Sequence, residues 1–183
     1  YAELKREVDA FAGGLLALGL EPGDRIGIWS PNNSEWVVAQ YATAKAGLIL
    51  VNINPAYRVS ELEYALNKVG AKALILASSF KSSDYVAMLR ELAPEIDGCA
   101  PGALKSARLP HLLRAIQIGD ETAAGFFNFT DIADLADDSH HQHIEGLAGT
   151  LQFDDPINIQ FTSGTTGFPK GATLTHFNIL NNG

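Results

Sequence analysis

Apolar residues near the N-terminus recur every three or four positions, which is the spacing of one face of an α-helix. They are Leu4, Val8, Phe11, Leu15 and Leu18. Gly19 follows directly, and a glycine just past the last apolar position commonly ends a helix. The stretch therefore predicts an amphipathic helix closed by Gly19.

Three short apolar runs then predict strands over residues 25–29, 48–51 and 73–76. The last two are apolar at every position, which is typical of strands buried on both faces. Because helical patterns separate these runs, the alternation predicts βαβ units. The expected fold class is α/β, with a mostly parallel sheet flanked by helices on both faces.

The intervening helices carry their own start signals. Ser34 is the expected N-cap of a helix over residues 34–45. Ser60, with Glu63 three residues later, has the pattern of a capping box for the next helix. A third helix is expected from about residue 82 to residue 92.

The middle of the chain is less regular. Within residues 93–113, Pro94, Pro101, Gly102 and Pro110 predict an irregular connection. It is followed by a predicted strand over 114–118 and a short helix over 129–135. Residues 137–143 gather two aspartates and three histidines, His140, His141 and His143. A solvated loop is the favoured interpretation of this segment, and a metal site is the alternative. No metal ligand is assigned.

Composition narrows the classes of function. The chain has 183 residues, of which 46% are hydrophobic, enough for one globular core. Its net charge of −8 and the absence of a basic cluster argue against nucleic acid or an anionic membrane surface as the main partner. No apolar run approaches the roughly 20 residues of a membrane span. Cys99 is the single cysteine, so an internal disulfide is excluded.

The strongest chemical signal lies near the C-terminus, where the alternating run 157–161 leads into a stretch rich in glycine. Glycines at 164, 167 and 171 allow several backbone N–H groups to approach one phosphate. Hydroxyl donors come from Thr162, Ser163, Thr165 and Thr166, and Lys170 adds a positive charge. The stretch predicts a loop that binds polyphosphate.

The loop differs from the P-loop pattern G-x-x-x-x-G-K-[ST]. Pro169 and Gly171 stand where that pattern requires glycine and a hydroxyl residue. Pro169 also prevents a helix from opening there. Residues 172–174 instead predict a short returning strand, with Thr175 as the N-cap of a helix that begins near His176. The expected order is strand, loop, strand and then helix.

Residues 161–176 resemble the nucleotide-binding signature of the acyl-adenylate-forming superfamily, which includes acyl-CoA synthetases, luciferases and the adenylation domains of peptide synthetases. Every glycine of the signature is present, and Ala172 stands where valine is commoner. Residues 45–55 and 61–64 resemble fatty acyl-CoA synthetases, and residues 101–106 and 155–160 resemble particularly the medium-chain enzymes. The resemblance thus covers most of the chain.

The resemblance implies a fatty acid–CoA ligase. Such enzymes use Mg²⁺ and ATP to convert a carboxylic acid, here a medium-chain fatty acid, to acyl-AMP and pyrophosphate, and the thiol of CoA then displaces AMP. The implied phosphate-binding residues are Thr162, Ser163, Gly164, Thr165, Thr166, Gly167, Phe168, Pro169 and Lys170, with Gly171 and His176 as additional candidates. Lys170 is not the family's adenylating lysine, which belongs to a C-terminal domain.

The same resemblance implies that residues 1–183 are a partial N-terminal AMP-binding domain without the C-terminal lid domain, and that they have negligible ligase activity alone. No catalytic residue is assigned to this chain. A mitochondrial location is implied by the medium-chain subgroup. Two alternatives stay open: a non-catalytic module that binds a nucleotide or a partner, and an adenylation domain of peptide synthesis.

Other candidates are assigned by position. Trp29 and Trp36 could line an acyl pocket, but core packing is favoured for both. Asn52, Asn54 and Tyr57 follow a buried strand, where open parallel sheets place ligand loops. An ordinary turn is the favoured interpretation of these three residues.

Overall fold

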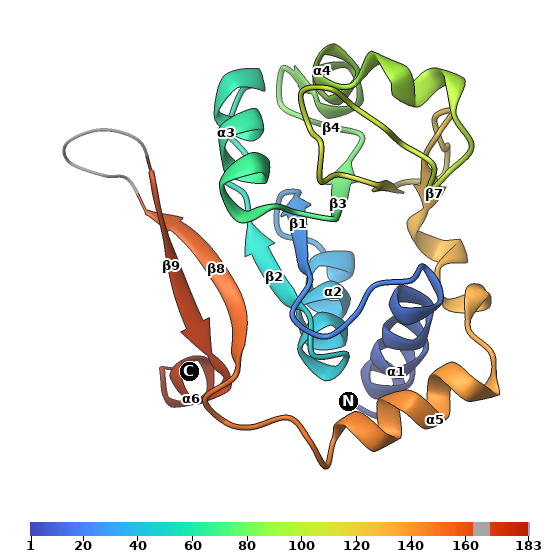
Figure 1. The fold of residues 1–183 in the computed structure, drawn as a ribbon, viewed down its shortest axis with the longest axis vertical. Coiled ribbons are helices and arrows are strands. Elements are labelled where there is room, and N and C mark those ends of the chain that lie inside the picture. The colour runs from blue at the N-terminus through green and yellow to red at the C-terminus, as the bar shows by residue number, and fades with distance from the viewer. Residues whose placement is uncertain (163–168, 183) are drawn as a thin grey trace.

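A computed structural model describes residues 1–162 and 169–182. In this described part, seven strands form one sheet in the order β7-β6-β3-β1-β2-β8-β9 (Figure 1). The strands are β1 (Arg25–Trp29), β2 (Ile49–Asn52), β3 (Ala73–Ala77), β6 (Arg114–Ile118), β7 (Phe127–Asn128), β8 (Pro156–Thr162) and β9 (Lys170–Thr175). Neighbouring strands are parallel except β8 and β9, which pair antiparallel. The predicted mostly parallel sheet is confirmed.

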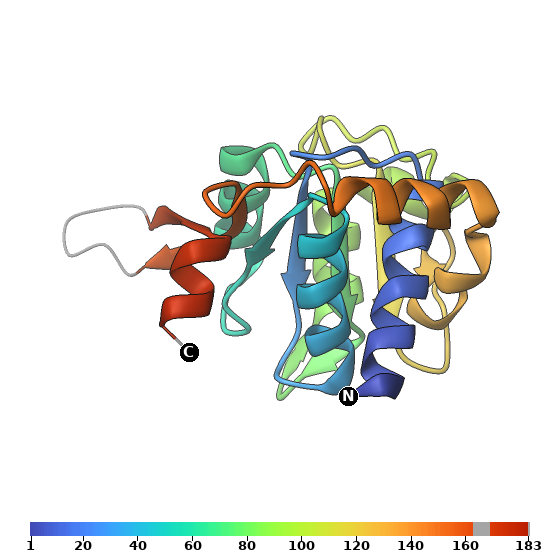
Figure 2. The same ribbon diagram turned by 90° about the horizontal axis from the view of Figure 1, so that it is seen from below.

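Helices cover both faces of this sheet. Helices α1 (Ala2–Ala17), α2 (Ser34–Lys45) and α5 (Asp138–Leu147) pack on one face, as Figure 2 shows. Helices α3 (Val59–Val69) and α4 (Tyr85–Leu92) pack on the other, and α6 (His176–Asn181) follows β9. Shorter elements complete the chain: the hairpin strands β4 (Ser79–Phe80) and β5 (Ser83–Asp84), and the 3-10 turns at Pro94–Gly98, Phe129–Asp131 and Ala133–Leu135.

Strand β3 shows why the continuous apolar runs form the centre of the sheet. All five of its residues are buried. Ile75 lies in the cluster beneath α1 and α2, whereas Leu74 and Leu76 lie in the cluster beneath α3 and α4. Successive side chains of a strand point to opposite faces, so a strand covered on both sides needs apolar residues throughout.

Three helix starts differ from those predicted. Asn33 rather than Ser34 caps α2, because its side chain accepts a hydrogen bond from the backbone N–H of Trp36 at 2.8 Å. At α3, Glu61 rather than Glu63 bonds back to the first turn, by accepting from the backbone N–H of Arg58 at 3.0 Å. Helix α4 begins at residue 85 instead of about 82, because the preceding residues form the β4–β5 hairpin.

The histidine-rich segment is a helix, so its interpretation as a solvated loop is wrong. Asp137 caps α5, and its carboxylate accepts hydrogen bonds from the backbone N–H groups of Ser139 and His140 at 3.0 and 3.1 Å. Ile144 and Leu147 are buried against the α1 side of the sheet. The predicted helix over 129–135 is instead two separate 3-10 turns.

Within the described ranges, no three His, Cys, Asp or Glu side chains gather as metal ligands. Among these same residues, no helix is both long and apolar enough to cross a membrane.

Gly14 provides a test of the packing between α1 and the turns at 129–135. A Cβ at this position would lie 1.9 Å from the carbonyl oxygen of Ile132. Gly14→Ala should therefore lower the free energy of unfolding by about 1–3 kcal/mol through overpacking, although alanine is the better helix former. Urea unfolding followed by circular dichroism measures the change.

The matched control is Gly146→Ala in α5, where an added Cβ has no neighbour within 4 Å among the described atoms. This substitution should raise stability by up to about 1 kcal/mol, because only helix propensity changes. Equal stabilisation by both substitutions would contradict the close approach of α1 to Ile132.

Candidate phosphate-binding hairpin

Strands β8 and β9 form the hairpin that carries the candidate site. Their pairing extends from Pro156 opposite Thr175 to Thr162 opposite Lys170. The strand–loop–strand–helix order predicted for this region is present, with Thr175 capping α6 through a bond from the backbone N–H of Asn178 at 3.2 Å. The loop residues Ser163, Gly164, Thr165, Thr166, Gly167 and Phe168 lie outside the described residues.

Thr162 and Lys170 stand side by side where the hairpin leaves the sheet. They are cross-strand partners, and the hydroxyl of Thr162 donates to the carbonyl oxygen of Lys170 at 3.3 Å. Both residues are exposed. Because directly opposed residues project from the same face of an antiparallel pair, the side chains of Thr162 and Lys170 lie on one face at this point.

The hairpin also lies at the edge where α/β sheets bind ligands. Strand β8 runs parallel to β2, so Thr162 is at the carboxyl edge of the parallel strands. Ligands of open α/β sheets bind outside this edge. Strand β9 is the last strand of the sheet on this side, as Figure 1 shows. The position of the hairpin therefore suits a binding loop.

Tyr64 of α3 contacts the hairpin next to its loop. Its hydroxyl donates to the carbonyl oxygen of Pro169 at 3.2 Å, and its ring meets that of Phe161 edge-on, with centroids 6.4 Å apart. The sequence interpretation did not assign Tyr64 to the site. The available signal was its place in the stretch 61–64, which shares the family resemblance.

Gly171, an additional candidate, lies in β9 opposite Phe161. A Cβ here would come within 3.0 Å of Ile159 Cγ2. Glycine therefore lets β9 pass close to the side chains of β8.

His176, the other additional candidate, lies at the far end of the hairpin. Its backbone N–H donates to the carbonyl oxygen of Asp155 at 3.3 Å, and the preceding Thr175 pairs with Pro156. Six residues separate His176 from Lys170, which corresponds to roughly 20 Å of strand. A role for His176 in phosphate binding stays a prediction.

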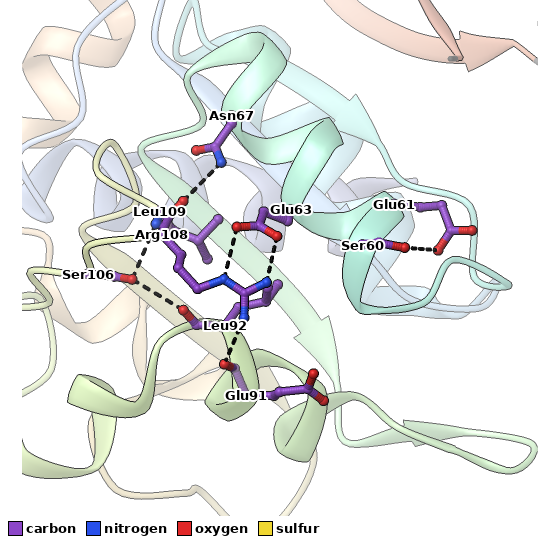
Figure 3. Close-up of polar contacts among 9 residues, drawn as sticks. All are labelled: Ser60, Glu61, Glu63, Asn67, Glu91, Leu92, Ser106, Arg108 and Leu109. Carbon is purple, nitrogen blue, oxygen red and sulfur yellow. Dashed lines mark hydrogen bonds and ion pairs between the residues drawn. The ribbon is translucent and has the colours of Figure 1, made fainter. Parts of the chain in front are cut away.

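Arg108 holds helix α3 in place (Figure 3). It belongs to the proline-rich connection, the irregular segment over residues 93–113. The guanidinium donates to both carboxylate oxygens of Glu63, at 2.9 and 2.6 Å, and to the backbone carbonyl of Glu91 at 3.3 Å. Asn67 completes the contact by donating to the carbonyl of Arg108 at 2.9 Å. The hydrogen bond from Arg108 lowers the pKa of Glu63.

A buried amide network fixes β8. Asn158 is fully buried; its side-chain oxygen accepts from Asn52 at 3.3 Å, and its nitrogen donates to Gln40 at 3.0 Å. Gln40 belongs to α2 and Asn52 to β2, so one side chain joins three elements. Asn52, a candidate for a ligand loop, thus lies at the end of β2 and donates its side-chain hydrogen bond to buried Asn158.

Trp29 lies in the core. It is fully buried and stacks on Tyr85, with ring centroids 3.8 Å apart. The hydroxyl of Tyr85 donates to the carbonyl oxygen of Pro55 at 2.6 Å. Burial raises the pKa of Tyr85 to about 12. Trp36 is partly buried and packs against the other core cluster.

Comparison with known proteins gives one consistent family. The family model described as AMP-binding enzyme matches residues 1–183. The medium-chain acyl-CoA ligase ACSF2, mitochondrial, of Macaca fascicularis is 52% identical over 185 residues, which cover 100% of this chain and 29% of that protein. The protein of the same name from Homo sapiens is 51% identical, with 100% and 30% covered. The chain thus spans less than a third of the length of these relatives.

Solved structures share the fold. Acetoacetyl-CoA synthetase from Streptomyces lividans superposes with a TM-score of 0.76 at 26% identity, covering 99% of this chain and 26% of that one. The inhibitor-bound N-terminal domain of FACL13 from Mycobacterium tuberculosis superposes with a TM-score of 0.72 at 25% identity, covering 96% and 37%.

Asn158→Ala tests the amide network. The substitution leaves Gln40 and Asn52 without their partner, so we expect a loss of about 1–3 kcal/mol in the free energy of unfolding. The control is Gln160→Ala on the same strand, where the side chain is exposed and the change should stay within about 0.5 kcal/mol. Urea unfolding of both variants makes the comparison, and equal effects would argue against the network.

Glu63→Gln tests the ion pair through its pH dependence. Since the folded-state pKa of Glu63 is lowered, its contribution is present above the unfolded-state pKa and is lost as pH falls through the folded-state value. The variant should be less stable than the parent at pH 7, and the difference should disappear under acid conditions. Urea titrations at several pH values measure this, and a difference independent of pH would contradict the ionic origin.

Proposed function

Since the chain belongs to the family of AMP-binding enzymes, we propose that it is the N-terminal portion of a fatty acid–CoA ligase. We propose further that the loop over residues 162–170 holds the phosphates of ATP. The observation that carries this second proposal is the pairing of Thr162 with Lys170. This pair lies next to the loop of the hairpin, at the carboxyl edge of the sheet.

Lys170 suits a phosphate partner because its charge is not neutralised locally. The residue is exposed, and it makes no ion pair with the other described residues. Its ammonium group offers three charged donors to an oxyanion. Gly171 directly follows, so β9 adds little bulk beside the lysine.

The proposed reaction has two steps. A carboxylate oxygen of the fatty acid attacks the α-phosphorus of ATP, the bond to the β-phosphate oxygen breaks, and pyrophosphate leaves as acyl-AMP forms. The thiol of CoA then attacks the acyl carbon and displaces AMP. In the first step Lys170 and the loop would stabilise negative charge on pyrophosphate and orient it as a leaving group. Mg²⁺ would enter bound to ATP, and we assign it no residue of this chain.

The relatives support a choice of substrate and location. Their names specify a medium-chain acyl-CoA ligase and a mitochondrial location. Over the aligned residues, about half of the positions are identical to this chain. We therefore propose a medium-chain fatty acid as the acyl substrate, CoA as the acceptor and mitochondria as the compartment. These names also favour a ligase that uses free CoA over an adenylation domain of peptide synthesis.

Carboxylate-dependent ATP–pyrophosphate exchange tests the function in the full-length product, with acids from acetate to palmitate. We expect exchange that is greatest at medium chain length. Lys170→Ala should reduce kcat/KM for ATP by about 100-fold, the order found when one charge-stabilising donor is removed. Lys105→Ala is the matched control, because Lys105 is exposed on the proline-rich connection.

Two outcomes would contradict the proposal. If the folded full-length product binds ATP but shows no exchange with any acid, the chain is better explained as a nucleotide-binding module. If Lys105→Ala reduces exchange as much as Lys170→Ala does, the effect is not specific to the hairpin, and Lys170 is not a phosphate ligand.

A further inference from the structure

We propose that Tyr64 is a positioning residue, which orients Lys170 by holding the carbonyl group of Pro169. The inference rests on the proposed function of the hairpin, because it assigns to Tyr64 the placement of the lysine that contacts phosphate. It goes beyond the nucleotide signature, because Tyr64 is 105 residues away from Pro169 in the sequence.

Among its contacts, Tyr64 meets both chain segments that flank the loop of the hairpin. Its ring meets Phe161 in β8, one residue before Thr162, and its hydroxyl binds Pro169, one residue before Lys170. Tyr64 therefore touches the chain just before it enters and just before it leaves the candidate phosphate site. A single side chain thus contacts the neighbours of both Thr162 and Lys170.

Holding the Pro169 carbonyl has a direct effect on Lys170. The carbonyl of Pro169 and the N–H of Lys170 belong to one planar peptide unit. A hydrogen bond to that oxygen therefore restrains the orientation of the Pro169–Lys170 peptide plane, and with it the backbone of Lys170. Pro169 lies outside β9, whose pairing begins at Lys170, so the Tyr64 hydroxyl holds the end of this peptide unit that lies beyond the strand.

Tyr64 is presented from a rigid support. The adjacent Glu63 is held by both nitrogens of the Arg108 guanidinium fork, and Arg108 also binds the carbonyl of Glu91 at the end of α4 (Figure 3). Leu62, Ala65 and Leu66 of the same helix are buried. By contrast, the first four residues of β9 are exposed. The contact therefore joins an exposed edge strand to a fixed helix.

Tyr64→Phe isolates the hydroxyl, because it keeps the ring that meets Phe161. In the exchange assay with the full-length product, we expect kcat/KM for ATP to fall about 10-fold, mainly through KM for ATP. The KM for the fatty acid should stay unchanged. Small displacements of positioning groups can have effects of this size or larger.

A double-variant comparison separates positioning from general structure. If Tyr64 acts through Lys170, Tyr64→Phe should have little further effect in a Lys170→Ala background. Tyr85→Phe is the control for loss of a similar bond, since Tyr85 donates to the carbonyl of Pro55. It should lower Tm without raising KM for ATP. Tyr41→Phe, on an exposed side chain of α2, should change neither quantity.

Hydrogen–deuterium exchange provides a readout that does not depend on activity. The amides of residues 170–172 should exchange faster in Tyr64→Phe, and at the parent rate in Tyr85→Phe. Unchanged amide exchange, or an unchanged kcat/KM for ATP in an active enzyme, would overturn the positioning role. So would an equal loss of kcat/KM in the Lys170→Ala background. Absence of activity in the parent, with faster amide exchange in Tyr64→Phe, would overturn the proposed function alone.

Discussion

The position of the candidate site depends on the parallel pairing of β8 with β2. More than a hundred residues separate these strands, and the chain between them forms β3, β6 and β7 of the same sheet. In the observed register the buried side chain of Asn158 bonds to both Asn52 and Gln40. A slip of one residue would turn every side chain of β8 to the opposite face. The register of β8 in turn determines where Thr162, and hence its partner Lys170, meets solvent.

Local signals predicted the C-terminal region well because the relevant constraints are local. Pro169 excludes a helix after the loop, and Thr175 caps α6 with its own side chain. The order of the strands in the sheet was not predicted. Strand β1 lies between β3 and β2, and tertiary packing rather than local sequence determines this order. The contact between Tyr64 and Pro169 was hidden for the same reason. Nothing in the helical periodicity of α3 distinguishes a half-buried tyrosine that faces a distant hairpin.

Two of the wrong predictions, at the start of α3 and in the histidine-rich segment, involve contacts between residues far apart in the sequence. A serine followed by a glutamate three residues later satisfies the capping pattern at 60–63, but Glu63 binds Arg108 from a distant connection. The nearby Glu61 bonds to the first turn of α3 instead. In the histidine-rich segment, polar composition indicated a loop. The helix forms because Asp137 caps it and because Ile144 and Leu147 find an apolar surface against α1, which the sequence does not reveal locally.

Electrostatics adds a final constraint on any polyphosphate held by this hairpin. The chain has a net charge of −8, so its overall field opposes the approach of an anion. At physiological ionic strength, charges more than about 8 Å away are largely screened, whereas contacts at hydrogen-bond distance are not. Affinity must therefore come from donors placed within a few ångströms of the phosphates. Under this condition the orientation of one lysine would matter more than the number of lysines, and the role proposed for Tyr64, holding the peptide unit before Lys170, would act on the quantity that limits binding.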